Sequence, residues 1–161
     1  KELGFEWIGK FDFPDNCLDS IELLAIVKAI EEVKQKVKPS IVYTHHFGDL
    51  NIDHKVVFEA TMTAFRPQPM ELCREIRTFE VSSATDYGCF SAQNAFVPNL
   101  YIDINDFWEA KQTALGCYEG EIRHVPHSRS LEGIDVLSKV RGMSVGLHRA
   151  EAFSVIRKCY P

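Results

Sequence analysis

Apolar residues recur at helical spacing in the first third of the chain and predict a helix there. Leu23, Leu24, Val27 and Ile30 begin the pattern, which continues to Lys38, and Pro39 ends it. Asp19 is the expected N-cap, with Glu22 as its capping-box partner three residues later. The aromatic, turn-rich stretch 7–16 predicts a short strand that runs into a loop.

A strand, a loop and a second helix are expected next. The segment Ile41–Thr44 is short, apolar and β-branched, which is typical of a buried strand in a parallel sheet. His45 and His46 follow it directly, and a polar loop leads to Asp53. The second helix is expected to run from His54 toward Phe65. This order is a strand–loop–helix unit.

The rest of the chain repeats the alternation of strands and helices. The expected elements are a strand over Arg74–Val81, a polar loop over Ser82–Pro98, a strand over Leu100–Asp103, a helix that is capped within Ile104-Asn105-Asp106 and runs to about Tyr118, a helix from about Leu131 into Val145, and a strand over Ala152–Ile156. Helices that alternate with short apolar strands indicate an α/β fold with a mainly parallel sheet. The length of 161 residues predicts a single domain over residues 1–161.

Composition and charge narrow the classes of partner. AVILMFWYC residues make up 45% and DEKR residues 25%, which is ordinary globular usage. The chain has 18 Lys and Arg residues against 23 Asp and Glu residues, a formal charge of -5. A broad cationic field is therefore absent, and neither nucleic acid nor an anionic lipid surface is an expected partner.

Cysteine usage and hydropathy indicate a cytoplasmic protein. The five cysteines are scattered without a C-x-x-C pair, which is typical of reduced thiols: Cys17, Cys73, Cys89, Cys117 and Cys159. No stretch reaches the roughly 18 consecutive apolar residues of a membrane helix, so no membrane span is expected. The N-terminus does not read as a signal peptide. The first residue is not Met, which leaves open that the numbering begins inside a longer protein.

Candidate chemistry is concentrated after the strand at Ile41–Thr44. Three of the six histidines and two aspartates lie within ten residues: His45, His46, Asp49, Asp53 and His54. Ligands of open α/β sheets collect beyond the carboxyl ends of strands, where this cluster is expected. Imidazole nitrogen and carboxylate oxygen are the usual ligands of a catalytic zinc.

A structural interpretation of the same residues stays open. Asp53 can cap the second helix, and His45 and His46 can satisfy backbone groups in the loop. The sequence contains no nucleophile elbow, P-loop or G-x-G-x-x-G motif that would indicate a different chemistry.

Residues 43–54 form the motif Tyr43-Thr44-His45-His46-x-Gly48-Asp49-Leu50-Asn51-x-Asp53-His54. This motif resembles the second signature of the LmbE-like (PIG-L type) zinc-dependent N-deacetylases. Further matches follow in the order of the family: Phe13-Pro14-Asp15-Asn16-x-x-Asp19, Phe79-Glu80-Val81-Ser82-Ser83, Pro126-His127-Ser128-Arg129-Ser130, Arg141-Gly142 and Ala150-Glu151-Ala152-Phe153. Each piece is weakly specific, whereas the ordered set is strong and covers essentially the whole chain.

The resemblance implies a Rossmann-like three-layer sandwich and removal of an acetyl group from N-acetylglucosamine-type sugars or glycoconjugates. It implies that His54 is a zinc ligand and that Asp53 orients the site. In such a mechanism the zinc polarises the acetamide and activates water. Many members carry a His at the position of Asn51, so we expect Asn51 to act as a hydrogen-bond donor, or His45 or His46 to supply the proton shuttle.

Three further residues are expected to contact substrate. His127 and Arg129 precede the helix at Leu131 and can bind a sugar hydroxyl or a phosphate at its N-terminus. Asp49 is the third expected substrate-binding residue. An exposed connector without a binding role is an equally good interpretation of His127 and Arg129.

The chain departs from the family by lacking the N-terminal Ala-His-Pro-Asp-Asp-Glu motif. That motif supplies two of the three zinc ligands and the usual base, so we expect the N-terminal βα units of the fold to be missing here. Either the numbering covers a fragment of a longer enzyme, or a shortened product folds by self-association as a homo-oligomer.

Three functional hypotheses remain from the sequence. The first is a zinc-dependent N-deacetylase that needs ligands from outside this chain. The second is a metal-free, oligomeric binding module of the same fold. The third, which we rank last, is an unrelated α/β domain that binds a small molecule.

Overall fold

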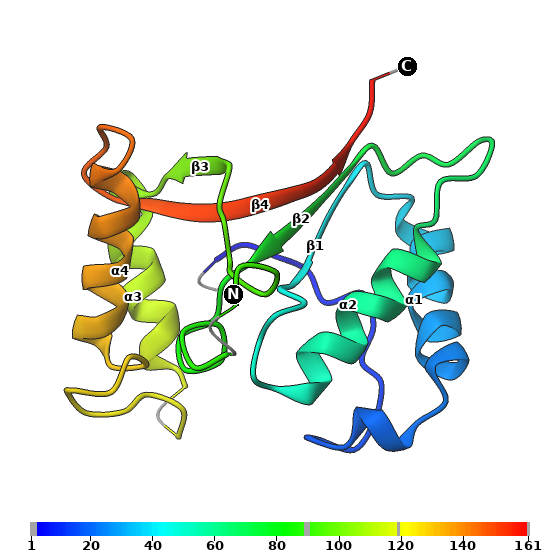
Figure 1. The fold of residues 1–161 in the computed structure, drawn as a ribbon, viewed down its shortest axis with the longest axis horizontal. Coiled ribbons are helices and arrows are strands. Elements are labelled where there is room, and N and C mark those ends of the chain that lie inside the picture. The colour runs from blue at the N-terminus through cyan, green and yellow to red at the C-terminus, as the bar shows by residue number, and fades with distance from the viewer. Residues whose placement is uncertain (1–2, 89–90, 119, 161) are drawn as a thin grey trace. The chain divides into compact units, whose positions relative to one another are not determined.

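Four strands and several helices make up the computed structural model, which describes residues 3–88, 91–118 and 120–160 (Figure 1). The elements in chain order are η1 (Leu18–Ser20), α1 (Leu23–Val37), β1 (Ile41–His45), α2 (Ile52–Ala64), β2 (Glu75–Phe79), β3 (Leu100–Asp103), η2 (Asn105–Phe107), α3 (Trp108–Gly116), α4 (Leu131–Met143) and β4 (Ala150–Lys158). The strands are hydrogen-bonded in the order β1-β2-β4-β3. The α/β class is thus confirmed. The sheet is mixed, because β1 and β2 pair in parallel whereas β3 and β4 pair antiparallel.

The described chain divides into two compact units. The β1–β2 unit comprises residues 7–97 and 154–160, and the α3–α4 unit comprises residues 3–6 and 98–153. The boundary between Phe153 and Ser154 falls inside β4. A single domain over residues 1–161 stays a prediction.

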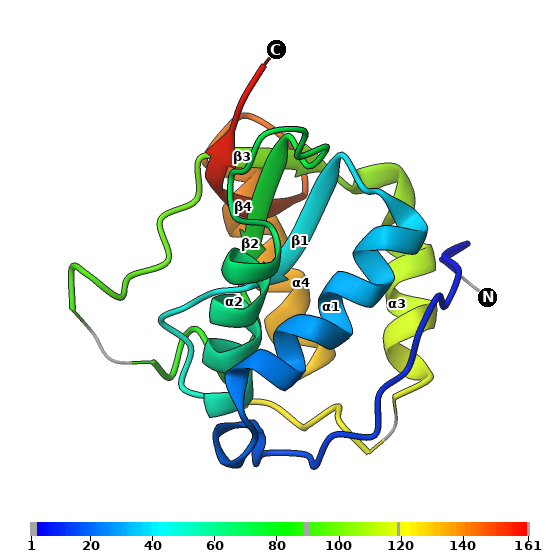
Figure 2. The ribbon, with the colours of Figure 1, turned by 90° about the vertical axis from the view of Figure 1, so that its right-hand side faces the viewer.

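Two helices cover one face of β1 and β2 in the β1–β2 unit (Figures 1 and 2). Side chains of β2 alternate across the strand, and Ile76 and Thr78 are fully buried. The buried core of this unit consists of Leu18, Ile26, Val27, Ala60, Ala64, Phe65, Cys73 and Ile76. This core fixes α2 against β1, where the hydroxyls of Thr44 and Thr61 lie 3.3 Å apart.

The parallel register brings the polar end of β1 beside β2. Ile41 pairs with Glu75, and His45 pairs with Phe79 at the carboxyl ends of both strands. The carboxyl ends of parallel strands are the usual ligand-binding edge of an α/β sheet. The fold therefore places His45 where the sequence predicted the site.

Residues 7–16 form no strand, so that prediction was wrong. Trp7 is 77% exposed and does not alternate against a packed face. Pro14 is followed by a turn at Asp15 and Asn16, with a φ of 54° at Asn16, which breaks an extended conformation.

The capping box predicted for α1 was also wrong. Asp19 lies inside η1, and α1 begins four residues later, after Glu22. Glu22 occupies the N-cap position without a side-chain hydrogen bond there. The helix ends as predicted, with Lys38 in the left-handed conformation before Pro39.

Two further expectations about β1 and α2 need correction. β1 is an edge strand rather than a buried one, and Ile41 and Tyr43 are 41% and 46% exposed. α2 begins at Ile52, two residues earlier than expected, because the side chain of Asn51 rather than Asp53 caps it. Asn51 Oδ1 accepts a hydrogen bond of 2.8 Å from the backbone N–H of Asp53.

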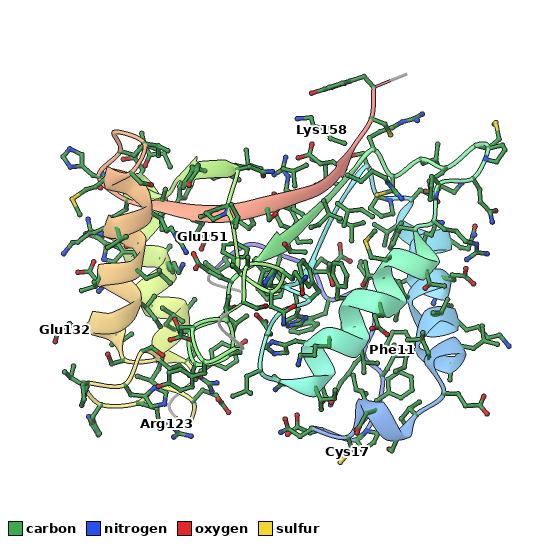
Figure 3. All side chains as sticks on the ribbon, viewed as in Figure 1. Phe11, Cys17, Arg123, Glu132, Glu151 and Lys158 are labelled. Carbon is green, nitrogen blue, oxygen red and sulfur yellow. The ribbon has the colours of Figure 1, made fainter. Side chains whose placement is uncertain are left out.

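The α3–α4 unit is held by polar contacts around Arg149. Its guanidinium lies 4.9 Å from the ring centre of Trp108 and donates to Asp135 Oδ1 at 3.0 and 3.1 Å. Lys111 pairs with Glu151 of β4 at 2.6 Å. Figure 3 labels Glu151 on this strand. The predicted bounds of β3 are correct to the residue.

Four cysteines of the described residues are free thiols: Cys17, Cys73, Cys117 and Cys159. Cys89 lies outside the described residues. Across the described parts of the chain, no helix has the length and apolar character needed to cross a membrane.

Candidate active site at the carboxyl end of β1

The candidate site is built on the short loop that joins β1 to α2. Asp49 N–H donates to the carbonyl of His46 at 3.2 Å, which closes the loop on itself. Leu50 N–H donates to the carbonyl of Ala84 at 2.8 Å, which ties the loop to the segment after β2. A Cβ on Gly48 would collide with the carbonyl oxygen of Asn94, so only glycine allows this close approach. The loop is therefore fixed from both sides.

A buried carboxylate orients one histidine of the loop–helix junction. Asp49 is fully buried, and its Oδ2 lies 2.7 Å from Nδ1 of His54 in the first turn of α2. Its other oxygen accepts a 2.6 Å hydrogen bond from the hydroxyl of Thr85. An ionised carboxylate only accepts, so Nδ1 of His54 is the donor in this bond, and in the neutral form of the ring Nε2 keeps its lone pair.

His45 lies directly against this histidine. The two imidazole rings stack with centroids 4.0 Å apart, and the ring of Phe79 on β2 lies 4.9 Å from the His45 ring. The pKa of His45 is lowered from the usual 6.5 to about 4, mainly by burial and next by the neighbouring His54; Asp49 acts in the opposite direction. His45 is therefore neutral at pH 7. Its Nδ1 is buried and has no hydrogen-bond partner among the described residues.

His46 has a different environment from His45. Its side chain is 2% exposed, and Nε2 lies 2.9 Å from the carbonyl of Asn94, to which it donates. The rings of Phe47 and Phe96 pack beside it, at 4.4 and 5.2 Å between centroids. This arrangement matches the alternative in which His46 satisfies a backbone group. A catalytic role for His46 stays a prediction.

Asn51 and Asp53 both bind the turn that precedes η1. Asp53 accepts from the backbone N–H groups of Asn16 and Leu18, and Asn51 donates to Asn16 Oδ1 at 3.2 Å. The structure thus gives structural partners to Asn51, expected as a hydrogen-bond donor in the reaction, and to Asp53, expected to orient the site. Their catalytic roles stay predictions.

His127 and Arg129 belong to the α3–α4 unit. His127 Nδ1 accepts from the backbone N–H of Arg129 at 3.0 Å, and the Arg129 guanidinium pairs with Glu121. Ser130 caps α4 by accepting from Gly133 N–H at 2.9 Å. The turn is therefore ordered by internal bonds, and a substrate role for either residue stays a prediction.

Sequence reasoning did not single out Thr85 or Asn94. They contact Asp49 and His46 across 36 and 48 residues of chain. Neither lies in a motif with recognisable spacing to its partner, so no local signal indicated them.

The residues present do not complete a zinc site. No group of three or more His, Cys, Asp or Glu side chains in residues 3–88, 91–118 and 120–160 can hold a metal ion. A catalytic zinc takes three protein ligands and leaves one position open. Among these side chains, His54 has Nδ1 bound to Asp49, so only its Nε2 could be a metal ligand.

The chain matches a known family over its first part. Residues 1–65 match the PIG-L family, described as GlcNAc-PI de-N-acetylase. The similarity to the PIG-L/LmbE-like deacetylases therefore covers the first 65 of the 161 residues. No curated protein matches it.

Solved structures show the same fold. The conserved protein TT1542 from Thermus thermophilus is 16% identical with a TM-score of 0.72, and the alignment covers 99% of this chain and 70% of that one. N,N'-diacetylchitobiose deacetylase from Pyrococcus horikoshii is 15% identical with a TM-score of 0.70, covering 97% and 59%. GalB, the 4-carboxy-2-hydroxymuconate hydratase from Pseudomonas putida, is 16% identical with a TM-score of 0.63, covering 86% and 60%.

These similarities show which fold the chain has and how much of each solved structure it covers. The chain spans 59 to 70% of the length of these three structures. One is named as a deacetylase and another as a hydratase, so the shared fold alone does not select the reaction.

We expect Gly48→Ala to loosen the loop between β1 and α2, because the added methyl group would overlap the Asn94 carbonyl and Nε2 of His46. The melting temperature should fall by at least about 3 °C in calorimetry. Gly116→Ala is the matched control, since a Cβ there meets open space at the end of α3. An unchanged melting temperature in Gly48→Ala would contradict the tight approach.

We expect the His45 imidazole to titrate near pH 4 in the folded protein, followed by NMR of its ring protons. In the urea-unfolded chain the same resonance should titrate near 6.5, the ordinary pKa of the imidazole. Because the folded pKa lies below the unfolded one, stability is greatest above pH 6.5 and decreases as the pH falls from 6.5 toward 4. A folded midpoint near 6.5 would show that the ring is solvated.

Proposed function

We propose that this protein takes part in the hydrolysis of the acetamide of an N-acetylated amino sugar or glycoconjugate, as a member of the PIG-L/LmbE-like family. The observation that carries the proposal is the buried Asp49–His54 hydrogen bond of 2.7 Å at the carboxyl end of β1. It lies inside the segment that matches the GlcNAc-PI de-N-acetylase family. The deacetylase named for N,N'-diacetylchitobiose shares the fold and supports the same class of substrate.

Within this proposal Asp49 positions His54 rather than substrate. Its side chain is fully buried and both oxygens have donors, so neither is available to a sugar hydroxyl. Fixing the proton on Nδ1 presents the lone pair of His54 Nε2 outward from the carboxylate. The His54 side chain is 16% exposed and the Asp49 side chain 0%, so the imidazole is the more accessible member of the pair.

His45 places a neutral imidazole against the ring of His54. With its pKa lowered to about 4, it carries no positive charge at pH 7 that would repel a cation or an ammonium product. The stacked rings also hold His54 in one orientation. A neutral imidazole can donate one hydrogen bond and accept another. It cannot offer a full positive charge to an oxyanion.

Zinc belongs to the family's chemistry, and the described residues supply one of its ligands. His54 is the residue that we assign to the metal, and a zinc ion there needs two further protein ligands. We therefore assign the chain's own residues a part in holding and orienting, and derive no step that passes through the metal.

A second candidate function is a metal-free binding module of the same fold, with an N-acetylated sugar as ligand and a second copy of the chain as partner. The described residues contain no group of three or more His, Cys, Asp or Glu side chains that could hold a metal ion, which favours it. The two candidates differ in whether bound sugar is converted, which one assay decides.

The assay measures acetate released from N-acetylglucosamine and N,N'-diacetylchitobiose by the purified protein supplied with Zn²⁺. We expect His54→Ala to lower the rate by at least about a hundredfold and Asp49→Asn by about ten- to a hundredfold. His148→Ala is the matched control, because His148 is an exposed histidine of the α3–α4 unit.

Acetate release that is unchanged in His54→Ala would contradict the assigned site. Sugar binding without acetate release, observed by ligand-detected NMR, would support the binding module and overturn the deacetylase. Light scattering on the same samples measures whether a second copy is bound.

A further inference from the structure

Two hydrogen bonds fix the direction of the Thr85 hydroxyl, in the turn after β2. Its Oγ1 accepts a 2.7 Å hydrogen bond from the backbone N–H of Val81 and lies 2.6 Å from Oδ1 of Asp49. A hydroxyl carries one hydrogen, and the N–H of Val81 cannot accept it. The hydrogen of Thr85 therefore points at the Asp49 carboxylate.

The turn that carries Thr85 is held against the β1–α2 loop at two further points. Leu50 N–H donates to the carbonyl of Ala84 at 2.8 Å, and Ala84 is 4% exposed. A Cβ on Gly88 would lie 2.5 Å from the carbonyl oxygen of Gly48, so the two backbones approach closely there. Because Thr85 lies between these two contacts in the chain, its hydroxyl has a fixed position relative to the loop.

These contacts form one chain of hydrogen bonds that ends at His54. Thr85 donates to Oδ1 of Asp49, and Nδ1 of His54 lies 2.7 Å from Oδ2 of the same carboxylate. Asp49 is fully buried, so these donors rather than bulk water set the plane of its carboxylate. The terminal torsion of an Asp side chain has only a broad preference of its own. A donor on Oδ1 therefore helps to decide where Oδ2 points, and Oδ2 faces His54.

We propose that Thr85 is a positioning residue: its hydroxyl holds the Asp49 carboxylate in the orientation that keeps a proton on Nδ1 of His54, which leaves Nε2 as the nitrogen available for chemistry. The hydrogen-bond chain stands on these contacts alone, whereas its effect on a reaction rests on the proposed function. Thr85 donates its one hydrogen to Asp49, so it acts through His54 and offers no donor to a substrate. Loss of the hydroxyl should therefore slow acetamide cleavage and leave sugar binding almost unchanged.

Thr85 also stabilises its own turn, and experiment can separate this role from the positioning role. The hydroxyl accepts from Val81 N–H, a local bond that needs nothing from Asp49. A role limited to the turn predicts faster exchange of the Val81 amide proton and an unchanged His54 ring. The positioning role predicts a change in the His54 ring itself.

The test is Thr85→Val, which keeps the branched shape of the side chain and removes the hydroxyl. In long-range ¹H–¹⁵N NMR at pH 7, we expect the ratio of Nε2-protonated to Nδ1-protonated His54 to rise at least about tenfold, because a carboxylate free to rotate holds Nδ1–H less firmly. In sugar turnover, kcat should fall about tenfold while KM changes by less than about threefold. Thr85→Ser retains the hydroxyl and should restore both readouts.

The matched control is Thr63→Val, the same substitution at an exposed position of α2, where the hydroxyl donates to the Glu59 carbonyl of the same helix. It should leave the His54 ring and both kinetic constants unchanged. Thr85→Cys replaces the hydroxyl with a thiol, a weaker donor, and should give an intermediate ring-proton ratio. This variant keeps the test decisive if circular dichroism shows that Thr85→Val does not fold.

A ring-proton ratio equal to that of the unmodified protein, in Thr85→Val or in Thr85→Cys, would overturn the positioning role. A Thr85→Ser variant that fails to restore the ratio, or a loss of turnover carried by KM alone, would overturn it as well. If the unmodified protein releases no acetate, the proposed function fails while the ring-proton ratio still decides the role of Thr85.

Discussion

The hydrogen bond between the buried Asp49 carboxylate and His54 Nδ1 is the constraint on which the rest of the site depends. A fully buried carboxylate needs donors, and the imidazole of His54 and the hydroxyl of Thr85 supply one to each oxygen. Satisfying it fixes the β1–α2 loop, the first turn of α2 and the segment after β2 at one point. The orientation of His54, and through stacking that of His45, follows from this requirement.

Asp49 and Asp53, the two aspartates of residues 43–54, have different roles around this bond. Asp49 faces inward and sets the proton position of an imidazole, whereas Asp53 faces the turn before η1 and binds backbone N–H groups. Both lie within one short stretch of sequence, yet one is fully buried and the other partly exposed. The same residue type therefore orients a histidine in one position and holds a neighbouring turn in the other.

The spacing of apolar residues in the sequence predicted those elements whose position depends on nearby residues alone. The spacing of apolar residues located α1, and β3 was correct to the residue, because these elements depend on periodicity and on Pro39 as a breaker. The histidine and aspartate cluster was expected at the carboxyl end of β1, and the structure places His45, Asp49 and His54 in contact there. Contacts over 35 to 48 residues were not predictable, because the partners Thr85, Asn94 and Leu18 carry no spacing signal. The strand predicted over residues 7–16 was wrong for a related reason. Aromatic composition suggested a strand, but a strand also needs a neighbouring strand to pair with.

The protonation state of His54 tests the central claim most directly. Long-range ¹H–¹⁵N NMR at pH 7 distinguishes a ring protonated on Nδ1 from one protonated on Nε2. The account predicts that His54 is protonated on Nδ1, with Nε2 unprotonated, and that Asp49→Asn disturbs this preference. A His54 ring protonated on Nε2 in the unmodified protein would contradict it, because the nitrogen assigned to the site's chemistry would then have no free lone pair.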